Sequence, residues 1–246
     1  MYHTLQPELI IKTLETLNKR ISERFPGAGL SQVCADLLSL ARDTAARIEK
    51  ISRPNFALRT LIWLAIAASV ALLTSVAFVI FTSTRASDDL FSTLQGIDSG
   101  FNILVLTGAT LYFASSLEAR LKQRKALAAL HEFRSIVHVI DMHQLTKDPS
   151  MLGAARTSAS PERDMTSFEL TRYLDYCSEM LSLTAKCAAL YAETLSDPVV
   201  VDTVGDIERL TSDLSGKIWQ KITILQTLEG REMPLPIPAP PHKPVA

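Results

Sequence analysis

The residues of this sequence best suited to chemistry are two histidines, an arginine and an aspartate: His131, Arg134, His138 and Asp141. Steps of three and four residues put them on one face of a helix. Imidazole and carboxylate groups bind transition metals, although another helix would have to complete the ligand set. Residues seven apart lie about 10 Å apart along a helix, too far to share one ion, so His138 and Asp141 are the metal candidates. The interpretation we favour is a solvated or internally paired polar face, with metal or anion binding as the alternative.

The sequence matches two known functional motifs only in part. His131-Glu132 opens like the zinc-protease motif HExxH, but Ser135 stands where the second histidine is needed. Gly216-Lys217 resembles the end of a phosphate-binding loop, yet Ile218 replaces the serine or threonine that should follow the lysine. The sequence therefore predicts no catalytic residue, no cofactor and no enzymatic activity.

The cysteines form no CxxC pair and no disulfide framework: Cys34, Cys177 and Cys187. We expect them to be reduced thiols that serve packing. Cys177 lies close in sequence to Asp175 and Glu179, and acidic neighbours disfavour the thiolate that a nucleophile needs.

Charge is balanced over the whole chain. With 25 Lys and Arg against 26 Asp and Glu, the formal net charge is −1, so the sequence predicts no nucleic-acid partner. One acidic series lies near the C-terminus: Glu193, Asp197, Asp202, Asp206, Glu208 and Asp213. Such a series is either a solvated face or a docking surface for a basic protein partner.

The helices that carry these polar groups are accompanied by two long apolar segments. Residues 61–81 contain no charged residue, glycine or proline. A helix of that length spans about 30 Å, which matches the hydrocarbon core of a bilayer. Residues 99–117 also lack charge but are less apolar. Next to the first segment they are expected to return across the membrane, with residues 82–98 as a short external loop, so that the bilayer is the first partner of this chain.

Basic residues flank both apolar segments: Arg42, Arg47, Lys50, Arg53 and Arg59 before the first, and Arg120, Lys122, Arg124 and Lys125 after the second. The loop between the segments holds Arg85 against Asp88, Asp89 and Asp98. By the positive-inside rule both termini are cytoplasmic and the loop is external. The sequence thus predicts an integral protein of a bacterial inner membrane.

Small residues recur within the spans. Ala67, Ala71 and Ser75 follow one another every four positions, and Thr107 and Gly108 each have a small residue seven positions on. Small faces let helices approach closely in lipid, so we expect packing between the spans or between copies. Asn102 is the one strongly polar side chain in a span, near its outer end. It bonds between helices, lines a pore, or is satisfied by water or lipid headgroups.

The remaining residues predict amphipathic helices with apolar positions at three- and four-residue steps. Residues 1–54 form an N-terminal cytoplasmic pair, and 55–117 hold the transmembrane hairpin. A stalk helix over 118–148 continues the second span, followed by a linker at 149–165 and a helical hairpin at 166–230. Thr166 and Glu169 predict a capping box that opens this hairpin. The proline-rich residues 231–246 form an extended tail.

The predicted fold is all-α, a two-span transmembrane helical hairpin with a cytoplasmic antiparallel helical bundle. Long helices with seven-residue recurrences allow coiled-coil seams, so we expect a homo-oligomer. The sequence is consistent with two functions. The first is a membrane-anchored interaction or scaffold protein that presents its bundle at the inner leaflet. The second is an oligomeric two-span channel or membrane-disrupting effector, gated by the bundle.

Overall fold

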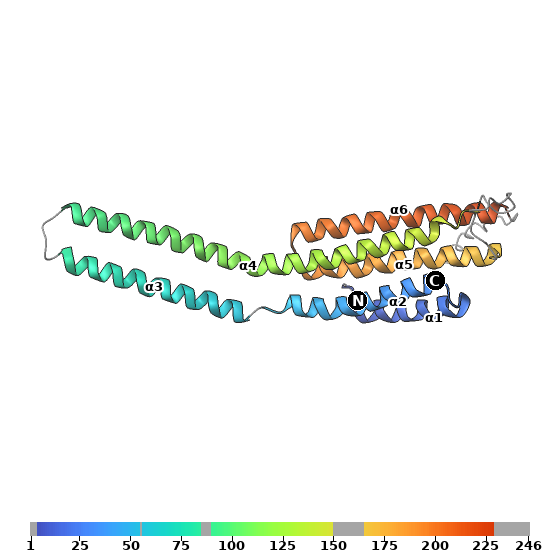
Figure 1. The fold of residues 1–246 in the computed structure, drawn as a ribbon, viewed down its shortest axis with the longest axis horizontal. Coiled ribbons are helices and arrows are strands. Elements are labelled where there is room, and N and C mark those ends of the chain that lie inside the picture. Colours follow the sequence, from blue (N-terminus) through green and yellow to red (C-terminus); the bar gives the residue numbers. More distant parts are fainter. Residues whose placement is uncertain (1–3, 55, 85–89, 150–164, 229–246) are drawn as a thin grey trace, which may run out of the picture. The chain divides into compact units, whose positions relative to one another are not determined.

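The computed structural model of the protein describes residues 4–54, 56–84, 90–149 and 165–228. Within these ranges the chain forms α-helices, and no β-strand occurs (Figure 1). The helices are α1 (Pro7–Arg24), α2 (Gly29–Ser52), α3 (Phe56–Thr84), α4 (Leu90–Leu145), α5 (Ser167–Thr194) and α6 (Pro198–Leu228). The prediction of an all-α chain is therefore confirmed for the described residues.

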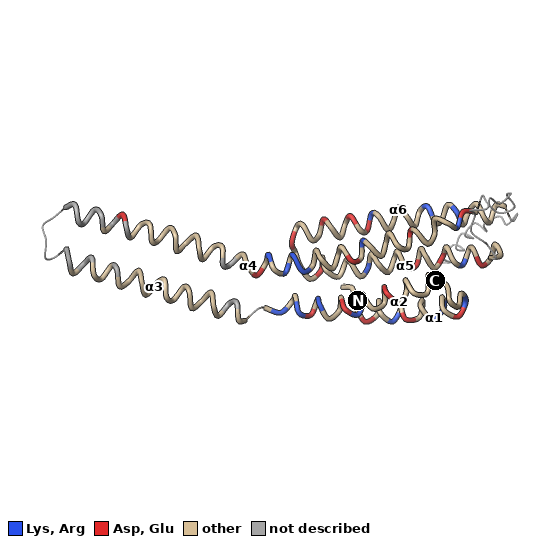
Figure 2. Tube along the Cα trace, viewed as in Figure 1, with Lys and Arg blue, Asp and Glu red and all other residues tan. Residues whose placement is uncertain are grey.

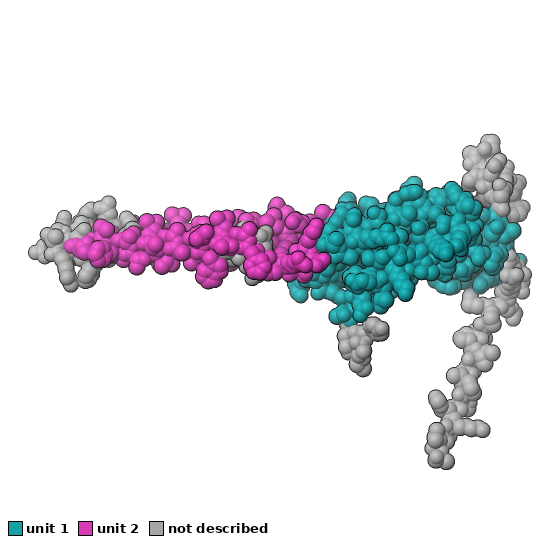
Figure 3. All heavy atoms as spheres, turned by 90° about the horizontal axis from the view of Figure 1, so that it is seen from below, with its two compact units in different colours: residues 1–48, 129–246 teal, residues 49–128 magenta. Residues whose placement is uncertain are grey.

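The chain divides into two compact units (Figure 3). The first unit comprises residues 1–48 and 129–246, and the second comprises residues 49–128. Helices α1, α5 and α6 belong to the first unit and α3 to the second, while α2 and α4 contribute residues to both.

Proline and glycine residues set the ends of the N-terminal helices. Pro7 occupies the first turn of α1, where a missing N–H costs no hydrogen bond. The helix ends before Pro26-Gly27, and Gly27 has a φ of 73°, a left-handed conformation that suits glycine. Helix α2 then starts at Gly29. The Ser31 N–H donates to the Ala28 carbonyl, so the chain already turns helically there.

Side-chain caps open the last two helices. The Glu169 N–H donates to Thr166 Oγ1 (3.2 Å), and the Thr166 N–H donates to Glu169 Oε2 (2.8 Å), which confirms the predicted capping box. At α6, Asp197 Oδ1 accepts the N–H groups of Val199 (3.0 Å) and Val200 (3.1 Å). Each cap satisfies backbone donors that the first turn of a helix leaves free.

The hydrophobic core of the first unit is made by one apolar face of each helix. Its largest fully buried side chains include Leu14, Leu17 and Ile21 of α1, Leu30 and Leu37 of α2, Phe133 and Ile140 of α4, and Leu174, Tyr176, Met180 and Tyr191 of α5. Ile207 and Ile218 add the face of α6, which packs along α5. Burial of a large apolar side chain contributes about 1.5–3 kcal/mol, so these faces hold the helices together.

Charged residues are unevenly distributed along the helices. Figure 2 shows them along the helices of the first unit, whereas α3 and the neighbouring part of α4 carry long uncharged stretches. Ion pairs join separate helices at Arg42–Glu15 (2.6 Å) and Arg47–Glu132 (3.0 Å). These pairs are half-exposed, and pairs of that kind contribute at most about 1 kcal/mol each.

The external loop predicted at residues 82–98 differs from the structure. Helix α3 extends to Thr84 and α4 starts at Leu90, nine residues before the expected start of the second span. The reason is that residues 90–98 contain no proline and one glycine, and polarity alone does not prevent helix formation. Most of the predicted linker (149–165) and the whole proline-rich tail (231–246) lie outside the described residues.

Candidate functional site

The second unit exposes large apolar side chains on both of its long helices. Trp63 and Phe78 of α3 are 69% and 68% exposed, and Tyr112 of α4 is 77% exposed. Within the described residues, α3 and α4 are long and apolar enough to cross a membrane by length and composition, and neither apolar window has a buried residue. Surfaces of this extent are found where lipid or another apolar partner covers them.

Hydroxyl groups on these two helices bond to their own backbone. Ser69 Oγ donates to the Ala65 carbonyl (2.8 Å), and Thr110 Oγ1 donates to the Leu106 carbonyl (2.8 Å). Thr74, Ser75, Thr82 and Ser116 donate to carbonyls three or four residues back in the same way. This back-bonding satisfies each hydroxyl without water, which is what a lipid-facing helix requires.

The predicted span-packing residues lie mostly on exposed positions. Ala67, Ala71, Ser75, Asn102 and Gly108 are exposed, and Thr107 is half-buried. Asn102 Nδ2 donates to Asp98 Oδ2 (3.4 Å), one helical turn earlier. The more shielded face of α3 instead carries Ile62, Ile66, Ser69 and Leu73. Packing between copies through the small-residue face stays a prediction.

The polar face predicted on residues 131–141 lies on α4. His131, Arg134 and His138 are exposed, whereas Asp141 is half-buried. No group of three or more His, Cys, Asp or Glu side chains that could hold a metal ion occurs within the described ranges. Asp141 bonds to protein instead, because its Oδ1 accepts Gln144 Nε2 (2.5 Å).

A buried polar network joins the end of α4 to α6. Gln144 is only 2% exposed, and Lys221 Nζ donates to its Oε1 (2.6 Å) and to its carbonyl oxygen (3.0 Å). Together with Asp141, these bonds satisfy both ends of the Gln144 amide. A buried amide without partners would cost about 1–3 kcal/mol, so the network stabilises this end of the first unit.

His143, which sequence reasoning missed, lies beside this network. Its Nδ1 is 3.3 Å from the Tyr173 hydroxyl, and a Cβ placed on Gly29 would lie 2.8 Å from its Cε1. The imidazole therefore fits against the start of α2 because residue 29 has no side chain. Burial, and next the charge of Lys147, lower the pKa of His143, so at neutral pH the ring is neutral and Nδ1 can accept the Tyr173 O–H.

The thiols are placed in the core. Cys34, Cys177 and Cys187 are all buried and free. Burial raises the pKa of each thiol to about 12. At neutral pH almost none of them is ionised, and an unionised thiol is a poor nucleophile.

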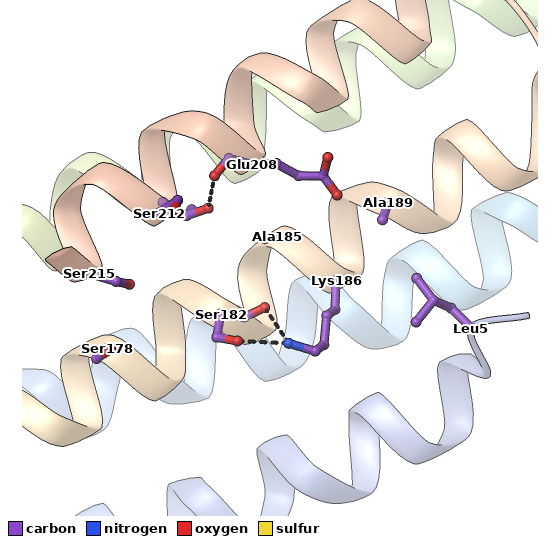
Figure 4. Close-up of a pocket in the computed structure, with 10 residues that line it drawn as sticks. Leu5, Ser178, Ser182, Ala185, Lys186, Ala189, Glu208, Ser212 and Ser215 are labelled. Carbon is purple, nitrogen blue, oxygen red and sulfur yellow. Dashed lines mark hydrogen bonds between the residues drawn. The ribbon is translucent and has the colours of Figure 1, made fainter. Parts of the chain in front are cut away.

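A groove of about 580 Å³ lies between α5 and α6 (Figure 4). Its lining consists mainly of small side chains, among them Ser178, Ser182, Ala185, Ala189, Ser212 and Ser215. Lys186 lies on the α5 side, where its Nζ donates to Ser182 Oγ (2.7 Å), and Glu208 lies on the α6 side. A groove with small walls admits close approach of another helix, and it carries one charge of each sign.

The acidic series of the C-terminal region is partly used within the fold. Glu193 accepts the Leu5 N–H (3.2 Å), Asp197 caps α6, and Asp206 pairs with Arg209. Asp202, Glu208 and Asp213 are exposed. Comparison with protein-family models, with curated proteins and with solved structures finds no significant match for this chain.

Proposed function

We propose that this chain is an integral membrane interaction protein, in which α3 and α4 cross the bilayer as a hairpin. Its first unit acts as an antiparallel helical bundle at the cytoplasmic leaflet of a bacterial inner membrane. The observation that carries the proposal is the apolar stretch Thr60–Val79, in which none of the residues whose burial the structure describes is buried. Each large apolar side chain left in water forgoes about 1.5–3 kcal/mol, and a bilayer supplies the missing environment.

Both termini are proposed to lie in the cytoplasm, because basic residues flank the two spans and the segment between them is acidic. Reporter fusions test this arrangement. Green fluorescent protein should fluoresce at Met1 and at Ala246, and alkaline phosphatase should be active only when inserted at Asp88. Termini on opposite sides, or a chain released by alkaline carbonate washing, would contradict the proposal.

Self-association is proposed to use the groove between α5 and α6. In a two-fold dimer the same surface meets itself, so Lys186 of one copy can approach Glu208 of the other. The small side chains Ser182 and Ala185 allow the helices to come close. Opposite charges at matching places favour this pairing and disfavour shifted registers.

Charge reversal at Lys186 and Glu208 tests whether the groove is the interface between copies. Lys186→Glu and Glu208→Lys should each shift the detergent-solubilised chain toward monomer in mass photometry, because like charges would then meet. The double exchange should restore the oligomer. Lys217→Glu and Asp213→Lys are matched controls, since both residues are exposed and neither lines the groove. Single reversals that leave the mass unchanged would refute the groove as the interface.

The channel alternative is less well supported by the same residues. A water-filled pore needs polar groups turned toward its lumen, whereas hydroxyls such as Ser69 and Thr110 bond to their own helix. We expect liposomes that contain the protein to retain an entrapped dye. Leakage that Asn102→Leu abolishes would replace the scaffold proposal with a channel.

A further inference from the structure

A second cavity of the first unit lies between α1 and α5 and is lined by arginines. Its volume is about 410 Å³, and its lining residues are Arg20, Glu23, Arg24, Arg172 and Tyr176. Helices α1 and α5 pack against each other, so residues more than 140 positions apart in sequence meet here. We call this cavity the arginine cleft.

Aromatic rings hold the three guanidinium groups in place. The guanidinium carbons of Arg20 and Arg172 lie 5.7 Å and 5.1 Å from the ring centroid of Tyr176, and that of Arg24 lies 5.5 Å from the ring of Phe168. Tyr176 is 1% exposed, so its ring is a fixed platform. Cation–π contacts of this kind restrict long side chains that would otherwise move freely.

The arginines keep hydrogen-bond donors for a ligand. Arg20 pairs with Glu179 through Nη2, and Arg172 pairs with Asp175 through Nη1 (2.7 Å). A guanidinium has five N–H donors, so each of these pairs leaves several unused. Among the described residues, Arg24 contacts the Phe168 ring and forms no ion pair.

Three arginines and one carboxylate, that of Glu23, line the cleft. Glu179 and Asp175 pair with Arg20 and Arg172 but do not line the cavity, and Glu169 interacts electrostatically with Arg24. The planar fork of arginine matches the oxygens of a phosphate, and several arginines favour a ligand with more than one negative charge. The volume of the cleft lies in the range of small-molecule sites, about 300–1,000 Å³.

We propose that the arginine cleft binds a soluble small molecule that carries a phosphate group. Arg20, Arg24 and Arg172 contact the phosphate oxygens, and Tyr176 forms the floor. This site is independent of the membrane and self-association function, and it would make the first unit responsive to a phosphorylated metabolite.

Calorimetric titration of pyrophosphate into the full chain tests the proposal, with the protein in nanodiscs of zwitterionic lipid. We expect saturable binding that weakens as sodium chloride is added. Arg24→Gln should weaken binding about tenfold or more, because a hydrogen bond to a charged group is lost. Glu23→Gln should strengthen binding, because it removes the one carboxylate of the lining.

Arg209→Gln is the matched control, since Arg209 is an exposed arginine of α6 that pairs within its own helix and does not line the cleft. It should bind like the unaltered chain. Circular dichroism checks that each variant is folded, and the opposite effects of Arg24→Gln and Glu23→Gln separate binding from folding damage. Absence of binding, equal effects of Arg24→Gln and Arg209→Gln, or weaker binding by Glu23→Gln would overturn the proposal.

Discussion

Substitution of Gly29 by alanine probes the contact between the start of α2 and His143. The new Cβ would lie 2.8 Å from His143 Cε1, whereas carbon atoms in contact are about 3.5–4.0 Å apart. The imidazole must therefore move by roughly 1 Å, and its 3.3 Å contact with the Tyr173 hydroxyl is lost. Loss of one such hydrogen bond costs about 0.5–1.5 kcal/mol.

The same substitution also has a stabilising effect, because alanine reduces the conformational entropy of the unfolded chain relative to glycine, which is worth about 0.4–1 kcal/mol. In the unaltered chain the two effects nearly cancel. With His143→Ala already present there is no ring to displace, so Gly29→Ala should then stabilise by about 0.4–1 kcal/mol. The coupling free energy between residues 29 and 143 is therefore expected to be about 0.5–1.5 kcal/mol.

Thermal unfolding of the four chains in detergent, followed by circular dichroism, measures this coupling as a double-mutant cycle. A difference of 1 kcal/mol corresponds to roughly 2–4 °C in Tm for a chain of this size. Gly205→Ala is the control, because a Cβ there meets no atom within 4 Å and should stabilise equally with or without His143. Equal effects of Gly29→Ala in both backgrounds would refute the reasoning.

Three further predictions follow from caps, titration and burial. Thr166→Ala should lower the unfolding free energy by about 1 kcal/mol and Thr166→Ser should largely preserve it, since only the hydroxyl caps α5; equal denaturation curves would contradict this. Because the pKa of His143 is lowered on folding, the unfolded chain binds more protons. Stability should therefore decrease as pH falls below about 6.5, and His143→Gln should reduce this dependence in denaturant titrations. Burial raises the pKa of Cys177 to about 12, so maleimide should label it at neutral pH only after unfolding; rapid labelling of the folded chain would be inconsistent with its burial.

Sequence reasoning succeeded where the cause is local. The capping box at Thr166 predicted the start of α5, because caps act within one helical turn. The stalk helix expected over residues 118–148 buries one apolar face, that of Phe133, Val137 and Ile140, in keeping with the three- and four-residue steps of its apolar positions. Sequence reasoning failed at residues 90–98, which were expected in a loop and are helical, because polar composition does not distinguish a loop from an exposed helix.

Contacts between distant residues depended on the tertiary structure. His143 is a single residue outside the predicted polar face, and only packing brings Gly29 and Tyr173 to its ring. The arginine cleft likewise combines Arg20 and Arg172, which no sequence spacing relates.

By itself the sequence determined that the chain is helical and that two of its helices are apolar enough to cross a membrane, since periodicity and apolar runs are properties of neighbouring residues. Which helix faces meet, and therefore which polar groups share a cleft or a network, was decided by the packing of side chains from several helices at once. That information resides in the shapes and volumes of surfaces that form only when the chain is folded.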